Sequence, residues 1–250
     1  MFVILMVLLG HITPTPLMIA HAGGGINGQN YSNSLEALEH NYQQGFRHFE
    51  IDFSWTSDAQ LVCLHDWKKR FKKVFGYKTK QPLSLKEFKK LIAQNISLHP
   101  CTEKSLATWL LKHPDARVIT DVKYDNIKAI KHIIQSHPRI QSQLIPQFYQ
   151  PQEYQLLREL GFQQLIWILY QYKGTYASVV ELSKSMDLLA ISMRASQVKK
   201  KFVKQLIINK HKIFIYTIND VNKVEKLVNK YHVSGIYTDF LLIGDAWGYF

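Results

Sequence analysis

Two carboxylates stand two residues apart in an apolar stretch, where Glu50 and Asp52 interrupt the run FEIDF. If this run forms a β-strand, alternation places both carboxylates on one face and Phe49, Ile51 and Phe53 on the other. Two acidic side chains inside a hydrophobic strand repel each other and lose hydration, so the pattern makes sense mainly if a cation lies between them. The stretch therefore predicts a metal site.

Two histidines, a third carboxylate and a lysine stand near the ends of other extended segments. His21 follows a short buried segment, and His65 ends the extended segment that continues from the carboxylate pair. Asp121 and Lys123 repeat the two-residue spacing late in the next predicted strand. If these strands belong to one parallel barrel, their carboxyl ends gather at one mouth, and we expect the side chains to converge there.

The converging residue types indicate chemistry at phosphorus. Three carboxylates favour one hard divalent cation, Mg²⁺ or Ca²⁺, with Mn²⁺ also compatible. Histidines titrate near neutrality, so one of His21 and His65 can accept a proton from a nucleophile while the other donates one to a leaving oxygen. Lys123 adds positive charge for a phosphoryl oxygen. These are the parts required for phosphoryl displacement, where catalysis consists mostly of positioning and charge stabilisation.

The elements that position these residues alternate regularly along the chain. Extended segments are predicted to start at residues 17, 46, 117, 144, 164, 188, 212 and 235, and helical segments separate them. Eight β/α units in a single domain of this length indicate a closed TIM-type (β/α)8 barrel. An open doubly wound sheet is the alternative, but the one glycine-rich turn, residues 23–25, lacks the GxGxxG spacing. Those glycines instead permit close approach of the backbone to a ligand.

The ends of the chain suggest a barrel domain over residues 17–250, preceded by an apolar segment over residues 1–16. The run MFVILMVLL in that segment lacks a basic flank and is too short to span a bilayer. We interpret the segment either as a signal or anchor remnant or as a cap packed on the barrel. A signal or anchor would associate the protein with the cell envelope, whereas a cap is compatible with the cytoplasm.

Charge and cysteine content narrow the range of partners. The 31 Lys and Arg residues exceed the 19 Asp and Glu residues, which gives a net charge of +12. This balance favours phosphorylated small molecules or peripheral contact with a phospholipid surface. Nucleic acid is not expected, because the lysines form short clusters. Cys63 and Cys101 lack a CxxC or zinc-type spacing, so neither a disulfide nor a cysteine-bound metal is expected. The basic segment 71–81 is predicted to be a loop.

The chain resembles the glycerophosphodiester phosphodiesterase family of the phosphatidylinositol-phospholipase-C-like barrels. The matching stretches extend from about residue 17 to residue 240. They are IAHAGG, YSNSLEAL, GFRHFEIDFSWTSDAQLVCLHDW, VITDVK, IYTIND and GIYTD. The most specific part is the combination of a histidine, a Glu-x-Asp pair, and a His-Asp pair fifteen residues after the glutamate.

The resemblance implies a role for each matched residue. His21 and His65 would be the acid/base pair, Glu50 and Asp52 would bind the metal, and Asp121 would be the third ligand. Lys123 would take the phosphate-binding position. Two departures stand out: Ala22 replaces the arginine that commonly follows the first histidine, and an aspartate replaces the usual third glutamate. The Asp-x-Lys pair is similar to that of sphingomyelinase D and phospholipase D toxins.

Other residues are expected to line the pocket that holds the substrate. Gln147, Arg194 and Tyr216 fall near the ends of predicted strands, and Trp67 is placed to form an aromatic wall. The leading function is metal-dependent hydrolysis of a glycerophosphodiester to an alcohol and glycerol phosphate. The alternatives are a lysophospholipase D or sphingomyelinase D type of activity on lipids, and a non-catalytic barrel that binds phosphorylated ligands.

Overall fold

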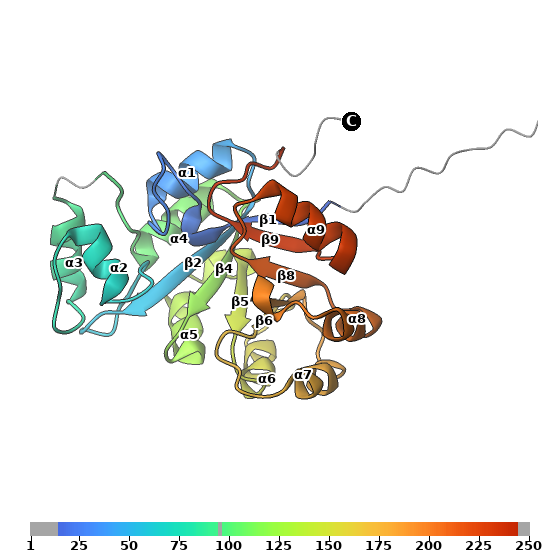
Figure 1. The fold of residues 1–250 in the computed structure, drawn as a ribbon. Helices are drawn as coiled ribbons and strands as arrows, with labels where there is room; N and C mark the ends of the chain where they lie inside the picture. The colour runs from blue at the N-terminus through green and yellow to red at the C-terminus, as the bar shows by residue number, and fades with distance from the viewer. Residues whose placement is uncertain (1–14, 95–96, 245–250) are drawn as a thin grey trace, which may run out of the picture.

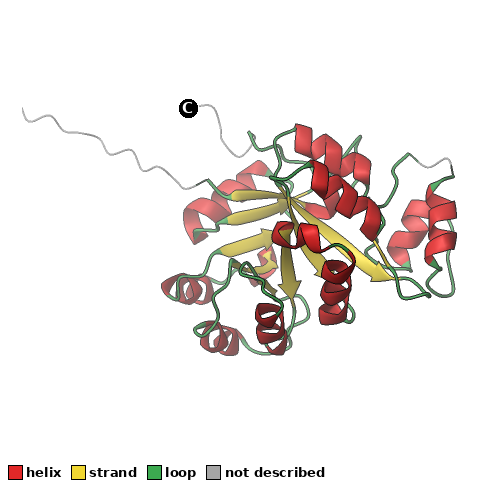
Figure 2. Ribbon diagram, turned by 180° about the vertical axis from the view of Figure 1, so that it is seen from behind, coloured by secondary structure: helices red, strands yellow, loops and turns green. Residues whose placement is uncertain are grey.

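The computed structural model describes residues 15–94 and 97–244, which form a closed parallel barrel surrounded by helices (Figures 1 and 2). Around the barrel the strands follow the order β1-β9-β8-β7-β6-β5-β4-β2, and pairing of Ala20 with Phe49 closes β1 onto β2. The fold predicted from the sequence is confirmed. The parallel strands are β1 (Leu17–Ala20), β2 (His48–Trp55), β4 (Arg117–Val122), β5 (Leu144–Phe148), β6 (Ile166–Ile168), β7 (Ala190–Arg194), β8 (Ile213–Tyr216) and β9 (Gly235–Thr238).

Capping residues fix where several of the helices begin. Ser34, Thr102 and Asp220 each accept a hydrogen bond from a main-chain N–H in the first turn of the following helix. The α-helices are α1 (Leu35–Gln43), α2 (Lys69–Phe75), α3 (Leu85–Ile92), α4 (Glu103–Lys112), α5 (Asn126–Ser136), α6 (Gln152–Glu159), α7 (Tyr176–Ser183), α8 (Lys200–Ile208) and α9 (Val221–Tyr231). Among the described residues, no helix is both long and apolar enough to cross a membrane.

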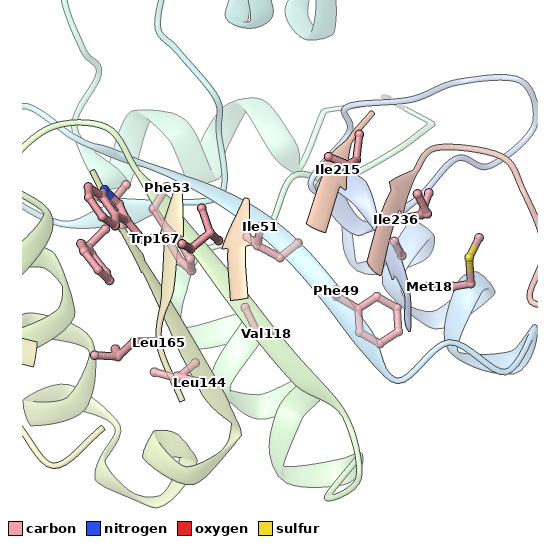
Figure 3. Packing of buried hydrophobic residues seen from close by; sticks show 14 of the residues in the cluster. Met18, Phe49, Ile51, Phe53, Val118, Leu144, Leu165, Trp167, Ile215 and Ile236 are labelled. Carbon is pink, nitrogen blue, oxygen red and sulfur yellow. The ribbon is translucent and has the colours of Figure 1, made fainter. Parts of the chain in front are cut away.

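Alternation along the strands separates two apolar regions. Phe49, Ile51 and Phe53 belong to the large cluster between the strands and the helices, part of which is drawn in Figure 3. A smaller cluster fills the barrel interior, and Ile119 belongs to it. Glu50 is the register partner of Ile119 on the neighbouring strand, so Glu50 also points inward. The interior carboxylates of β2 therefore lie above an apolar floor.

An insertion between β2 and β4 lies at one side of the barrel, beyond the end of β2 (Figure 1). It contains β3 (Leu61–Val62), α2 and α3. The predicted loop over 71–81 is wrong for its first part, because α2 extends to Phe75. Phe71 and Phe75, one helical turn apart, pack against each other in a separate apolar cluster. In this cluster Phe71 also contacts Trp67, and Phe75 contacts Phe88. Packing of α2 against α3 therefore stabilises a helix in a segment whose basic, polar composition predicts a loop.

Cys63 and Cys101 form a disulfide, contrary to the expectation from their spacing. They are 38 residues apart in sequence, but their Cα atoms are 4.9 Å apart. The Cys63 N–H donates to the Cys101 carbonyl oxygen over 2.8 Å, so the chain leaving β3 runs beside the chain that enters α4. Sequence spacing does not reveal this pairing of two distant segments. The disulfide closes the base of the insertion.

Of the apolar segment 1–16, the structure describes only the last two residues. The alternatives of a signal or anchor remnant and a barrel cap therefore lie outside the described residues.

Candidate active site

Three carboxylates from two neighbouring strands form the centre of the site at the barrel mouth. Glu50 and Asp52 project from β2, and Asp121 projects from β4 as the register partner of Asp52. One oxygen of each carboxylate lies within 4.8 Å of the others. Glu50 and Asp52 are 3% and 2% exposed, so little water solvates their charge. An all-oxygen donor set of this size and charge fits a hard divalent cation.

Fixed hydrogen bonds orient the carboxylates. Lys123 donates from Nζ to Asp52 over 2.9 Å and to Asp121 over 2.8 Å. Asn33 donates from Nδ2 to the other oxygen of Asp52 over 3.0 Å, and its own Oδ1 accepts the Asp52 N–H over 3.0 Å. The Ala22 N–H donates to Glu50 over 2.8 Å. The donor set is thus held in place by groups from several different elements.

The electrostatic environment shifts the pKa values of the three acids in different directions. Burial, together with the charges of Asp52 and Asp121, raises the pKa of Glu50 well above its ordinary value. Burial alone would also raise the pKa of Asp52, but the hydrogen-bonded Lys123 ammonium, together with His65 and His21, outweighs burial and lowers it to about 2. Burial raises the pKa of Asp121 despite the nearby lysine. Glu50 therefore experiences most of the repulsion that a cation would relieve.

His21 is held by a carboxylate that directly follows the last strand of the barrel. Its Nδ1 lies 2.8 Å from Oδ1 of Asp239, and its Nε2 lies 3.9 Å from Glu50. Burial alone would raise the pKa of Asp239, but the hydrogen bond and charge of His21 and the hydrogen bonds from Asn219 and Asn30 together outweigh burial and lower it. An ionised Asp239 can only accept, so the hydrogen bond places a proton on Nδ1 and directs Nε2 toward the carboxylate centre. Asn219 and Asn30 donate to the second oxygen of Asp239.

His65 is arranged in the same way by its sequence neighbour. Its Nδ1 lies 2.9 Å from Asp66, whose pKa is lowered because hydrogen bonds from His65 and two main-chain N–H groups outweigh partial burial. Tyr31 contacts both histidines edge-on, with ring centroids 4.3 Å from His21 and 5.7 Å from His65. The Arg70 guanidinium stacks 3.6 Å from the centre of the Tyr31 ring. Tyr31 therefore fixes the separation of the two imidazoles.

The glycine run after His21 contacts protein rather than the cavity. A side-chain carbon on Gly24 would lie 2.4 Å from the amide of Asn41, and one on Gly25 would lie 2.3 Å from Phe240. Asn41 donates to the carbonyl oxygens of Gly23 and Gly25 over 3.1 and 3.2 Å. These close contacts hold the turn that carries His21 against the end of β9.

A cavity of about 470 Å³ opens above the carboxylates and is lined by nearly all the predicted site residues. Trp67 does not line it. Its ring packs against Phe71 and Phe88, and its Nε1 donates to the Trp55 carbonyl oxygen, so it supports the insertion. The predicted residues that do line the cavity are His21, Glu50, Asp52, His65, Asp121, Lys123, Gln147, Arg194 and Tyr216.

Several residues of the site were not predicted from the sequence. Asp239 ends the YTD stretch quoted for the family resemblance, but its contact with His21 spans 218 positions. Asn33 lies in the YSNSLEAL stretch, but nothing in the sequence indicates its contact with Asp52. Tyr149 donates its hydroxyl to Asp121 from just after β5. Only the positions within matched stretches carried a usable signal.

A closed parallel barrel with three carboxylates, a lysine and two histidines at its mouth defines a phosphodiester-hydrolysing barrel. Residues 23–243 match the glycerophosphoryl diester phosphodiesterase family, and the chain belongs to this family of phosphoric diester hydrolases.

Solved structures support the same fold. A glycerophosphodiester phosphodiesterase from Thermotoga maritima is 19% identical, with 90% of this chain and 94% of that chain covered and a TM-score of 0.70. One from Parabacteroides distasonis is 18% identical, with 91% and 94% covered and a TM-score of 0.70. A phosphodiesterase from Oleispira antarctica, solved with the product sn-glycerol-3-phosphate, is 20% identical, with 90% and 93% covered and a TM-score of 0.69.

Proposed function

We propose that the protein hydrolyses glycerophosphodiesters to an alcohol and glycerol phosphate, with a divalent cation and a pair of histidines. The observation that carries this proposal is that His21 and His65 line the same cavity as Glu50, Asp52 and Asp121. The cation would be Mg²⁺, Ca²⁺ or Mn²⁺, held by the three carboxylates. When bound, it would supply Lewis-acid stabilisation of the charge on the phosphoryl oxygens.

The histidines would move the protons of the reaction. The Nδ1 of each histidine is hydrogen-bonded to an aspartate, which leaves Nε2 as the atom that exchanges a proton with the substrate. One Nε2 removes a proton from the attacking oxygen as the new P–O bond forms. The other donates a proton to the alcohol oxygen as the old P–O bond breaks. Lys123 neutralises Asp52 and Asp121 and contributes positive charge beside the phosphate.

The test is a panel of soluble diesters, including glycerophosphocholine, assayed with each metal for the wild type, His21→Ala and His65→Ala. Each substitution is expected to lower kcat by roughly 10²–10⁴-fold, the usual contribution of a general acid or base. His40→Ala is the matched control, because this histidine is exposed on α1. Full activity in both active-site variants would remove the proposed mechanism. No turnover by the wild type with any metal would remove the proposed function.

A lipid substrate is a second candidate, and the charge of the insertion favours it. Between residues 66 and 94 there are ten Lys and Arg residues and two acidic residues, so this segment carries +8 of the net +12. Its nine lysines are exposed, and the segment begins beside His65 at the cavity mouth. Such a surface suits peripheral contact with anionic phospholipid, as a lysophospholipase D or sphingomyelinase D type of activity would require.

Lipid activity is tested with lysophosphatidylcholine and sphingomyelin beside glycerophosphocholine. Sedimentation with vesicles containing phosphatidylserine is compared for Lys89→Glu/Lys90→Glu on α3 and for Lys226→Glu/Lys230→Glu on α9. If the substrate is a lipid, we expect the wild type to turn over one of the two lipids. We also expect vesicle binding to be lost in the α3 variant and kept in the α9 variant. Turnover of the soluble diester alone, or equal losses in both variants, would exclude it.

A further inference from the structure

The cavity has a second half that faces the carboxylate centre from across the barrel. In the closed strand order, β7 is four strands from β2 in either direction, and β8 is four strands from β4. Arg194 ends β7 and pairs in register with Tyr216, which ends β8. Both side chains line the cavity. A ligand bound between these halves would thus reach from the carboxylates of β2 and β4 to the ends of β7 and β8.

This second half is cationic. Of the residues that line the cavity from β6 to α9, none is acidic, whereas Arg194 and Lys223 carry positive charge. In the described part of the chain, no carboxylate lies within 4.0 Å of either side-chain cation. Asp220, three residues before Lys223, caps α9 by accepting the Lys223 main-chain N–H over 3.2 Å.

Aromatic residues hold the arginine and add a hydrogen-bonding group. The Arg194 guanidinium lies 4.9 Å from the centre of the Tyr170 ring, which also lines the cavity. The hydroxyl of Tyr216 is buried and has no hydrogen-bond partner among the residues that the structure describes. A buried hydroxyl without a partner is costly unless a ligand supplies one. Two cations and this hydroxyl therefore make a donor set that matches an oxyanion.

We propose that Arg194, Lys223 and Tyr216 bind an anionic group on the alcohol portion of the substrate, beyond the phosphate that is cleaved. The scissile phosphate belongs beside Lys123 and the carboxylate centre, so a cation across the barrel is placed to bind a different charge. The inference rests on the proposed function and deepens it. The preferred substrates are glycerophosphodiesters whose alcohol bears a phosphate, and those with a quaternary ammonium are poor substrates.

Two ligands that differ by one phosphate test this subsite: glycerophosphoinositol and glycerophosphoinositol 4-phosphate. The wild type is expected to prefer the phosphorylated diester in kcat/KM by roughly tenfold or more, as hydrogen bonds to charged groups allow. Arg194→Gln should reduce this preference by a similar factor, and Lys223→Gln should reduce it several-fold. Lys226→Gln on the same helix, outside the cavity lining, is the control and should leave the ratio unchanged.

Binding separates this inference from the catalytic proposal. Isothermal titration calorimetry with His65→Ala should show tighter binding of the phosphorylated ligand, and Arg194→Gln in that background should remove the difference. This readout requires no turnover, so it stands even if the hydrolytic proposal fails. Equal affinity for the two ligands would overturn the anionic-alcohol subsite. An equal loss of affinity for both ligands on Arg194→Gln would also overturn it, because that result would assign the arginine to the scissile phosphate.

Discussion

Replacing Glu50 with glutamine should change stability in opposite directions with and without a divalent cation. Glu50 is 3% exposed, and its carboxylate lies close to those of Asp52 and Asp121. Glutamine keeps the shape and can still accept the Ala22 N–H through its amide oxygen, but it carries no charge. The variant should therefore be more stable than the wild type without metal and gain less stability from metal.

The distances between the carboxylates set the expected size of the change in the free energy of unfolding. Two unit charges 4.8 Å apart repel by about 3.5 kcal/mol at an effective dielectric constant of about 20. Glu50 faces two such charges, but Lys123 offsets part of the repulsion and the raised pKa lets Glu50 bind a proton instead of remaining charged. We expect Glu50→Gln to stabilise the metal-free protein by roughly 1–3 kcal/mol. Loss of one ligand should weaken metal binding at least about tenfold, or about 1.4 kcal/mol.

The pH dependence provides a second signature. Because the folded-state pKa of Glu50 is raised above 4.5, the folded protein holds a proton that the unfolded chain releases. The stability from this group is fully present below pH 4.5 and is lost as the pH rises through the raised pKa. Glu50→Gln lacks this loss, so its advantage without metal should grow with pH.

The assay is urea unfolding, followed by circular dichroism in EDTA and again with added Mg²⁺, Ca²⁺ or Mn²⁺. The wild type should gain about 2.7 kcal/mol at a metal concentration 100 times the Kd. Glu225→Gln, an exposed change on α9, is the control and should respond to metal as the wild type does. A metal-free variant less stable than the wild type, or an unchanged metal response, would refute the assignment of Glu50 as a ligand under repulsion.

Three further predictions address groups around the site. Asp239→Asn should lower kcat by roughly 10- to 100-fold without a matching change in KM, because His21 loses a charge-assisted hydrogen bond; a kcat within twofold of wild type would contradict this. Reduction of the Cys63–Cys101 disulfide should lower the free energy of unfolding by up to about 4 kcal/mol in urea titrations, and a double serine variant should not respond to the reductant. Glu36→Gln should destabilise the protein at neutral pH by less than about 1 kcal/mol. The pKa of Glu36 is lowered because hydrogen bonds outweigh partial burial, so the difference should vanish as the pH falls below 4.5 through that lowered pKa, and a pH-independent difference would count against it.

Local patterns predicted most of the fold and the centre of the site. The eight parallel strands follow from apolar segments alternating with amphipathic ones, and the inward direction of Glu50 and Asp52 follows from strand alternation alone. The helix over 69–75 was missed because its stability comes from aromatic contacts with α3 rather than from its own composition. The disulfide was missed for the same reason, since two segments 38 residues apart meet only in the folded chain.

The partners of the histidines show where sequence patterns stop being sufficient. Asp66 follows His65 directly, so its hydrogen bond is local, whereas Asp239 reaches His21 only because the barrel places β1 between β2 and β9. His21 thus contacts Glu50 on one side of the closure and Asp239 on the other. The position of this histidine therefore depends on barrel closure more strongly than the positions of the carboxylates on β2 and β4 do. A change that weakens pairing of β1 with β9 should impair the proton transfer proposed for His21 before it impairs the proposed metal binding.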